Sequence, residues 1–298
     1  MPDSSVFALL NIHKPSGPTS HDIVAAVRRG TRIKKVGHAG TLDPMAAGVL
    51  VLCLGPATRL SEYVMESPKT YLARVHLGVE TDTYDADGSI VAENPALVSR
   101  ETVEAALAAF RGEIDQIPPM YSAIQHGGQR LYDLARAGIE VEREARRVTI
   151  FALDLIAWEP PVVMLRVKCS PGTYIRSLAH DLGQMLGVGA HLAALERSAS
   201  GRFTVDNAVR WVDFQAAMQA GTWRAYLLPP DLALADTPSM VLDAEQAQHI
   251  RQGQMIPANT AAVGVARAYD PDGQFFAVLE GRGLYWKPQK VFITGSQL

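Results

Sequence analysis

The chain has 298 residues, of which 48% are hydrophobic and 20% charged, values that fit a globular protein with one large and one small domain or with two medium ones. No apolar run approaches the roughly 20 residues of a membrane-spanning helix, and the N-terminus lacks the pattern of a signal peptide. The two cysteines, Cys53 and Cys169, form no CxxC pair, so we expect no disulfide or zinc framework and a cytoplasmic location.

The net charge of −3 would by itself argue against a nucleic-acid partner, but the charges are unevenly distributed. Residues 1–60 carry seven Lys and Arg against three Asp, a balance of +4. Residues 61–124 have a balance of −7, and residues 125–176 return to +2. The basic segments could form one face around an anionic ligand. Fluctuations of this size are also common in soluble domains, so charge alone leaves both interpretations open.

Hydrophobic periodicity and capping residues predict a series of helices and strands. In chain order these are a helix over residues 21–30 with Ser20 as its N-cap, strands over 48–55 and 71–78, a helix from Ser99 towards Gly112, a strand over 162–169 and a helix that ends at Gly187. The run GVLVLCLG (48–55) is too short for a buried helix and is typical of a core strand. Since helices and strands mix without a regular βαβ rhythm, the sequence predicts an α+β fold.

Residues 117–147 differ from the rest of the chain because they are polar, basic at several points and interrupted by glycines. Such a stretch is typical of a long surface insertion. The Pro-rich segment 228–238 suggests a linker. The remaining residues contain a short helix, then strands, with a hairpin around Pro271, Asp272 and Gly273, and they predict a separate small β-rich domain.

The segment KKVGHAGTLDPMAAGVLVLCLGPATR (34–59) contains Asp43 directly before Pro44. The proline biases Asp43 towards an extended or turn conformation, in a glycine-flanked loop that leads into the predicted core strand. A carboxylate on a loop aimed by a rigid strand is where a functional acid is expected. Asp-Pro is also an ordinary turn starter, so the residues alone leave a turn-capping role open.

The sequence around Asp43, GHAGTLDPMAAGVL, resembles the catalytic motif of the bacterial tRNA pseudouridine-55 synthases, the TruB family. Further segments resemble that family in the same order along the chain: HKPSGPTSHDIV (13–24), SPKTYLARVHLGVETDTYDADG (67–88), QIPPMYSAI (116–124), CSPGTYIRSLAHDLG (169–183) and GAHLAALERSASGRF (189–203). Several ordered blocks make a far more specific signal than one short motif.

The resemblance implies a pseudouridine synthase fold, a mixed and mainly antiparallel sheet flanked by helices, over residues 1–232, and a PUA-like domain over 238–298. It implies an enzyme that isomerises uridine-55 in the T stem-loop of tRNA. This reaction breaks the N1–C1′ bond, rotates the uracil and joins C5 to C1′. It requires an ionised nucleophile, a base flipped out of the stack and loss of the C5 proton. No redox step or metal is needed, so we expect no cofactor and no metal.

The resemblance also implies roles for individual residues. Asp43 would be the nucleophile, with attack at C1′, attack at C6 and a glycal route all left open. Arg176 would pair with Asp43 through its planar fork, and Tyr71 would stack on the flipped uracil and assist C5 deprotonation. Tyr174 and Leu195 would line the uracil site.

Further residues would bind the RNA. His38 would occupy the space that the flipped nucleotide leaves, and Lys14 and Arg59 would contact phosphates or support the site. The insertion 117–147 would be a thumb-like loop that closes over the T stem-loop, with arginines that could reach phosphates: Arg130, Arg136, Arg143, Arg146 and Arg147. The resemblance implies tRNA as the partner, with no guide RNA and no membrane, and a monomeric enzyme.

Two other functions remain open at this stage. A catalytically silent RNA-binding or tRNA-folding protein could keep the same fold, although the set Asp43, Arg176 and Tyr71 argues against loss of catalysis. A carboxylate-dependent hydrolase of nucleosides or glycosides would need a second carboxylate as proton donor. Asp82 and Asp85 are available for that role, but they belong to an acidic segment with no pocket signature.

Overall fold

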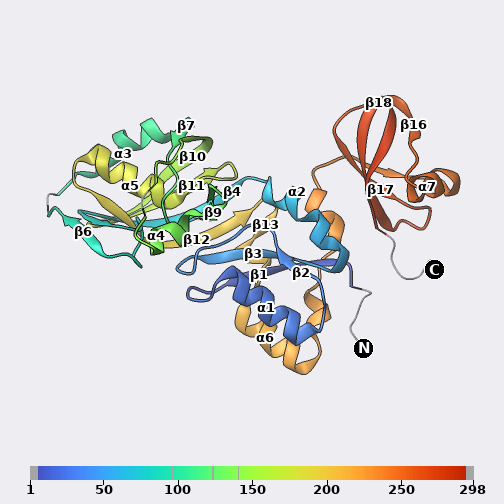
Figure 1. Cartoon of the computed structure of the whole chain (residues 1–298), viewed down its shortest axis with the longest axis horizontal. Helices are drawn as coiled ribbons and strands as arrows, with labels where there is room; N and C mark the ends of the chain where they lie inside the picture. Colours follow the sequence, from blue (N-terminus) through green and yellow to red (C-terminus); the bar gives the residue numbers. More distant parts are fainter. Residues whose placement is uncertain (1–5, 96, 123, 140, 293–298) are drawn as a thin grey trace.

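The structure is a computed structural model that describes residues 6–292 except 96, 123 and 140 (Figure 1). The strands of the main sheet are β1 (Ala8–Lys14), β2 (Val36–His38), β3 (Ala47–Leu54), β4 (Lys69–Leu77), β7 (Gly112–Gln116), β10 (Arg146–Glu159), β11 (Val162–Cys169), β12 (Ala190–Ser200), β13 (Phe203–Thr204) and β14 (Val209–Arg210). They run in the order β14-β1-β3-β12-β4-β11-β10-β7, with β2 beside β3 and β13 beside β12. The pairs β1–β14 and β3–β12 are parallel, and β1–β3, β4–β12, β4–β11 and β10–β11 are antiparallel.

The helices are α1 (Ser20–Thr31), α2 (Ser61–Met65), α3 (Arg100–Leu107), α4 (Leu131–Arg136), α5 (Ile175–Leu186), α6 (Trp211–Ala220) and α7 (Ala244–Arg251), with the 3-10 turns η1 (Gly55–Leu60), η2 (Ala108–Phe110), η3 (Val205–Asn207), η4 (Trp223–Tyr226) and η5 (Pro230–Leu234). Two short hairpins join β5 (Val79–Thr81) to β6 (Ile90–Glu93) and β8 (Gln125–His126) to β9 (Gln129–Arg130). The predicted α+β class is confirmed. No helix in the described part of the chain is long and apolar enough to cross a bilayer.

The burial of both faces of strand β3 explains why its sequence is an unbroken apolar run. Leu50, Leu52 and Leu54 belong to the main core beneath α1, α3, α5 and α6, where α1 and α6 lie side by side (Figure 1). Val49 and Val51 point to the opposite face and join a second core with residues of η1 and α2. A strand buried on both faces has no polar alternation. The strand therefore provides a rigid base for the loop that precedes it.

A separate sheet follows at the C-terminal end of the chain. Its strands β15 (Ser239–Val241), β16 (Ile256–Ala262), β17 (Val265–Tyr269) and β18 (Phe275–Val291) lie in the order β15-β17-β18-β16, and α7 packs against them. The predicted hairpin at residues 271–273 is confirmed as the β17–β18 turn, where Gly273 has a φ of +74°. Figure 1 shows this sheet in orange and red beyond α2.

Residues 228–238 are not a linker. Leu228 exchanges two backbone hydrogen bonds with Leu9, at 2.8 and 2.9 Å, and the following residues form η5. Leu234 is buried in a cluster with Leu60 and Phe292 that joins the main body to the C-terminal sheet. The prediction was wrong because the prolines indicated a break in regular structure, whereas the leucines between them bury apolar surface.

The start of the first helix also differs from the prediction. Thr19, not Ser20, caps α1, because its hydroxyl accepts a hydrogen bond from the Asp22 amide at 3.0 Å. The Ser20 hydroxyl instead donates to the Leu42 carbonyl at 3.0 Å and accepts from the Leu42 amide at 2.8 Å. The first turn of α1 is thereby bonded to the residue before Asp43.

Candidate active site

Asp43 lies on the loop between β2 and β3. The loop folds back on itself, since the Ala46 amide donates to the Asp43 carbonyl at 3.1 Å and the Ala39 amide to the Val51 carbonyl at 2.9 Å. Gly40 has a φ of +111°, a conformation that L side chains rarely adopt. The Asp43 side chain remains 36% exposed, so a substrate atom can reach its carboxylate.

Arg176 on the first turn of α5 meets this carboxylate. Its Nη2 lies 2.9 Å from Asp43 Oδ2, and the Arg176 side chain is only 7% exposed. The same Nη2 donates to the Tyr121 carbonyl at 2.9 Å. The predicted pairing of Arg176 with Asp43 is present, through one guanidinium nitrogen rather than a two-point fork.

A second carboxylate, Asp85, contacts the same guanidinium, with its Oδ2 3.5 Å from Arg176 Nη1. Asp85 is buried, and its Oδ1 accepts hydrogen bonds from the Thr83 hydroxyl at 2.6 Å and the Asp87 amide at 3.1 Å. Sequence reasoning weighed Asp85 only as a proton donor for a hydrolase. Both oxygens of Asp85 are thus engaged with groups inside the protein, and the argument for a hydrolase loses its second carboxylate.

Burial raises the pKa of Asp43 above its ordinary value of 3.8. The charge of Arg176 opposes this rise, as do its hydrogen bond and the charge of Lys14, whereas the charge of Asp85 adds to it. Arg176 is therefore the main group that favours the ionised form of Asp43.

The predicted uracil-site residues come from neighbouring elements. Tyr71 on β4 lies opposite Arg197 on β12, and Leu195 lies opposite Ala73, so Tyr71 and Leu195 share one face of the sheet. Burial raises the pKa of Tyr71, and the charge of Asp43 contributes to that rise. The structure thus places Tyr71 and Leu195 on the sheet face that α5 covers.

Tyr174 is the residue directly before α5, the helix that carries Arg176. Its amide donates to Gln116 Oε1 at 2.7 Å, and its carbonyl accepts from Gln116 Nε2 at 2.9 Å. Burial raises the pKa of its hydroxyl, with smaller effects from the nearby charges of Arg146, Arg176 and Asp43. Sequence reasoning missed Gln116, which fixes the start of α5 and hence Arg176.

His38 at the end of β2 is half-buried beside the loop of Asp43. Burial lowers its pKa, and the positive charge of Arg197 lowers it further, so the imidazole is neutral near pH 7. Within the described part of the chain, its Nδ1 has no hydrogen-bond partner.

Lys14 and Arg59, which the sequence predicted to contact phosphates or to support the site, lie in different surroundings. Lys14 is 0% exposed, and its ammonium donates to the carbonyls of Pro15, Pro18 and Pro44, so it supports the Asp43 loop without reaching a phosphate. Arg59 lies away from the site: it donates to the Val291 carbonyl at 2.8 Å and stacks over Phe292, which fastens the C-terminal sheet to η1. The positions of these residues in the sequence did not show which groups the charged ends of their side chains contact.

The arginines of the insertion differ in their surroundings. Arg143 donates to the Pro118 carbonyl at 3.0 Å, and Arg147 lies 3.4 Å from Asp115. Arg146 and Arg147 are the first two residues of β10, where the predicted insertion meets the main sheet. Arg146 is exposed. The side chains of Arg130 and Arg136 lie outside the described part of the structure.

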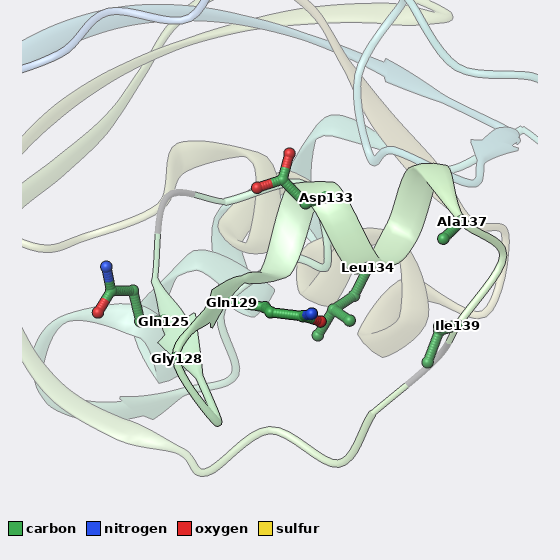
Figure 2. Close-up of a pocket in the computed structure, with 7 residues that line it drawn as sticks. All are labelled: Gln125, Gly128, Gln129, Asp133, Leu134, Ala137 and Ile139. Atoms are coloured by element: carbon green, nitrogen blue, oxygen red, sulfur yellow. The ribbon is translucent and has the colours of Figure 1, made fainter.

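The insertion encloses an open hollow of about 510 Å³ between the β8–β9 hairpin and α4 (Figure 2). Figure 2 shows Gln129 and Leu134 facing each other across it, with Gln125 and Asp133 pointing outward. The hollow does not include Asp43. The hollow is therefore a feature of the insertion and not of the loop that carries Asp43.

Comparison with known proteins identifies the family to which the chain belongs. Three family models match consecutive parts of the chain: "TruB family pseudouridylate synthase (N terminal domain)" over residues 28–175, "tRNA pseudouridylate synthase B C-terminal domain" over 176–235 and "tRNA Pseudouridine synthase II, C terminal" over 238–293. A curated relative from Dehalococcoides mccartyi, named tRNA pseudouridine synthase B, is 47% identical over 292 residues, which are 97% of each chain. The chain belongs to the TruB family.

Other curated relatives carry the same name. A protein of the same name from Azoarcus sp. is 45% identical over 99% of this chain and 97% of its own, and one from Symbiobacterium thermophilum is 49% identical over 84% and 83%. Among solved structures, the "Crystal Structure of a Cbf5-Nop10-Gar1 Complex" contains a chain with a TM-score of 0.76 and 26% identity, covering 97% of this TruB protein and 86% of that chain. The predicted family and fold are confirmed.

Proposed function

We propose that this TruB-family enzyme converts uridine-55 in the T stem-loop of tRNA to pseudouridine, with Asp43 as the nucleophile. The observation that carries the proposal is the exposed Asp43 carboxylate paired with the buried Arg176 guanidinium at 2.9 Å, in a chain whose relatives are named tRNA pseudouridine synthase B. In the reaction the N1–C1′ bond breaks, the C5–C1′ bond forms, C5 loses a proton and N1 takes one up, so the product is an isomer of the substrate.

The geometry supports a division of roles among the residues around Asp43. Arg176 favours the ionised carboxylate, and Asp85 orients Arg176. Tyr71 and Leu195 provide the surface on which the uracil lies, and Tyr174 closes one side. Flipping exposes the uridine to these groups, since a stacked base cannot be reached by a side chain.

The direct test is to map pseudouridine in a tRNA transcript incubated with the pure protein and no other RNA. We expect modification at uridine-55 alone, and none in a transcript that has cytidine at that position. Binding without any pseudouridine would favour the silent RNA-binding protein. Activity that requires an added RNA would show that the enzyme does not find its site unaided.

Replacing Tyr71 with phenylalanine should leave tRNA binding within about threefold, because the aromatic face that stacks on the uracil is kept. The single-turnover rate should fall at least about tenfold, or ~1.4 kcal/mol, if the hydroxyl takes part in removal of the C5 proton. Rapid-quench measurement of pseudouridine formation checks this, with Tyr226→Phe as a control on the distant η4 turn. Equal rates for Tyr71→Phe and the wild type would reduce Tyr71 to a stacking surface.

We propose that the insertion 117–147 closes over the T stem-loop and that Arg146 contacts a phosphate. Arg146 is exposed, and its charge acts on Tyr174 at the site. Its neighbour Arg147 already lies near Asp115 and Glu113, at 3.4 and 3.9 Å. The two residues therefore allow a matched comparison, because Arg147 is partly neutralised by nearby carboxylates and Arg146 is more available to a phosphate.

Arg146→Ala should reduce the slope of log affinity against log salt by about 0.7–0.9, the value for one neutralised phosphate. Arg147→Ala should reduce it by less, because its charge is partly satisfied by carboxylates in the free protein. Filter-binding or fluorescence titrations of an isolated T stem-loop from low to high salt measure both slopes. Equal slopes for wild type and Arg146→Ala would exclude the phosphate contact.

We further propose that residues 1–232 act as the catalytic domain and 238–298 as a PUA-like RNA-binding domain, in a monomeric cytoplasmic enzyme. The separate four-stranded sheet supports the division, and the free, buried Cys53 and Cys169 fit a reducing compartment. The C-terminal sheet is held against η1 and α2 by apolar residues and by Arg59, so it offers a fixed rather than a swinging surface.

A further inference from the structure

Arg197 on β12 is a buried cation beside the active site that the reaction scheme above does not use. Its side chain donates from Nε to the Val49 carbonyl at 2.8 Å, from Nη1 to Thr41 at 3.2 Å and from Nη2 to Gly40 at 3.0 Å. The residue is only 2% exposed, and no carboxylate in the described part of the chain lies within salt-bridge distance of it. Burying an unpaired guanidinium is costly unless its donors are satisfied, and here backbone carbonyls satisfy them.

The carbonyls that Arg197 contacts belong to the structure that carries the nucleophile. Gly40 and Thr41 precede Asp43 on the same loop, and Val49 is on the strand that follows it. Lys14 contacts the Pro44 carbonyl on the other side of Asp43. The loop is therefore held by one buried cation before the nucleophile and by another after it.

The position of Arg197 itself is tightly determined. Gly48 has a φ of +102°, and a Cβ there would lie 2.3 Å from the Arg197 carbonyl oxygen, so only glycine permits this approach of β3 to β12. Arg197 also lies opposite Tyr71 in the β4–β12 register. Burial raises the pKa of Tyr71, and the positive charge of Arg197 is the main effect that opposes the rise. One guanidinium thus adjoins both the loop of Asp43 and the proposed uracil-stacking residue.

We propose that Arg197 is a positioning residue that fixes the main chain of the Asp43 loop relative to Tyr71. The proposal rests on the proposed function of Asp43. It predicts that Arg197 contributes to the chemical step rather than to tRNA affinity, because its contacts are with the loop main chain and with the Tyr71 side chain, and not with solvent. An ammonium at this position cannot donate in a plane to three separate carbonyls.

Arg197→Lys is expected to lower the single-turnover rate of pseudouridine formation at least tenfold while the Kd for tRNA stays within threefold. Hydrogen exchange at the amides of residues 40–42 should become faster in the same variant. Arg111→Lys is the matched control, because Arg111 also donates through two nitrogens to one carbonyl, that of Leu153, at 3.1 and 2.8 Å. The control should keep the wild-type rate and the wild-type exchange of residues 40–42.

Unchanged rate and loop exchange in Arg197→Lys would overturn the proposal, as would a rate loss that vanishes when the assay is run far below the melting temperature of the variant. If Arg197→Lys does not fold, Gly40→Ala tests the same contact from the loop, where a Cβ would lie 3.5 Å from Arg197 Nη1 at a φ of +111°. It should lower the rate with binding retained; a wild-type rate would refute the inference. A wild-type enzyme without pseudouridine product would instead refute the proposed function itself.

Discussion

Replacing Asp43 with asparagine is expected to abolish pseudouridine formation while tRNA binding stays within about tenfold, or ~1.4 kcal/mol. The carboxamide has the size of the carboxylate, and its oxygen can still accept a hydrogen bond from Arg176, so the loop should keep its conformation. It cannot act as an ionised nucleophile, and the reaction has no other candidate at this position.

The measurement is pseudouridine per tRNA after long incubation with enzyme in excess, together with a binding titration. Asp87→Asn is the matched control, since Asp87 is an exposed carboxylate in the segment next to Asp85 and should leave both quantities unchanged. Turnover by Asp43→Asn above about one per cent of wild type would exclude Asp43 as the essential group.

Arg176→Lys should be severely impaired although the charge is kept. The guanidinium reaches Asp43 at 2.9 Å, Asp85 at 3.5 Å and the Tyr121 carbonyl at 2.9 Å, and a single ammonium cannot serve all three. We expect a loss of at least about 100-fold in the single-turnover rate, equivalent to ~2.7 kcal/mol.

The role of Asp85 can be separated from that of Arg176. Asp85→Asn keeps the side-chain size and the bond from the Asp87 amide, but it removes the charge that faces Arg176 Nη1. We expect a rate loss with tRNA binding retained, and a melting temperature measured alongside distinguishes it from unfolding. A wild-type rate in Asp85→Asn would show that Arg176 needs only Asp43 to be oriented.

The local features of this protein could be predicted from the sequence. The helix from Ile175 to Gly187 follows from its apolar spacing and its glycine stop, and the structure has Gly187 in the left-handed conformation. The strand Val162–Cys169 follows from the alternation of apolar and polar residues, and Leu165 and Val167, two of the alternating apolar residues, are buried. Such patterns depend on neighbours within a few residues, which the sequence shows directly.

The candidate site was only partly predictable. The pairing of Asp43 with Arg176 was expected from a family resemblance, because motif blocks far apart in the chain are recognisable together. Asp85 was missed as a partner of Arg176, and Arg197 was not singled out at all. Neither has a local signal: an aspartate in an acidic segment and an arginine in a strand are ordinary until the fold shows what they contact.

The sequence by itself determined the α+β class, the approximate positions of several helices and strands, the TruB family and the pairing of Asp43 with Arg176. Only the tertiary structure decided which charged side chains reach the site. Lys14 is buried beneath the Asp43 loop, Arg59 fastens the C-terminal sheet, and Arg197 contacts the carbonyls of Gly40 and Thr41. The physical reason is that the end of a long side chain is placed by packing and hydrogen bonding between strands distant in sequence, whereas backbone periodicity reports only which face the side chain leaves from.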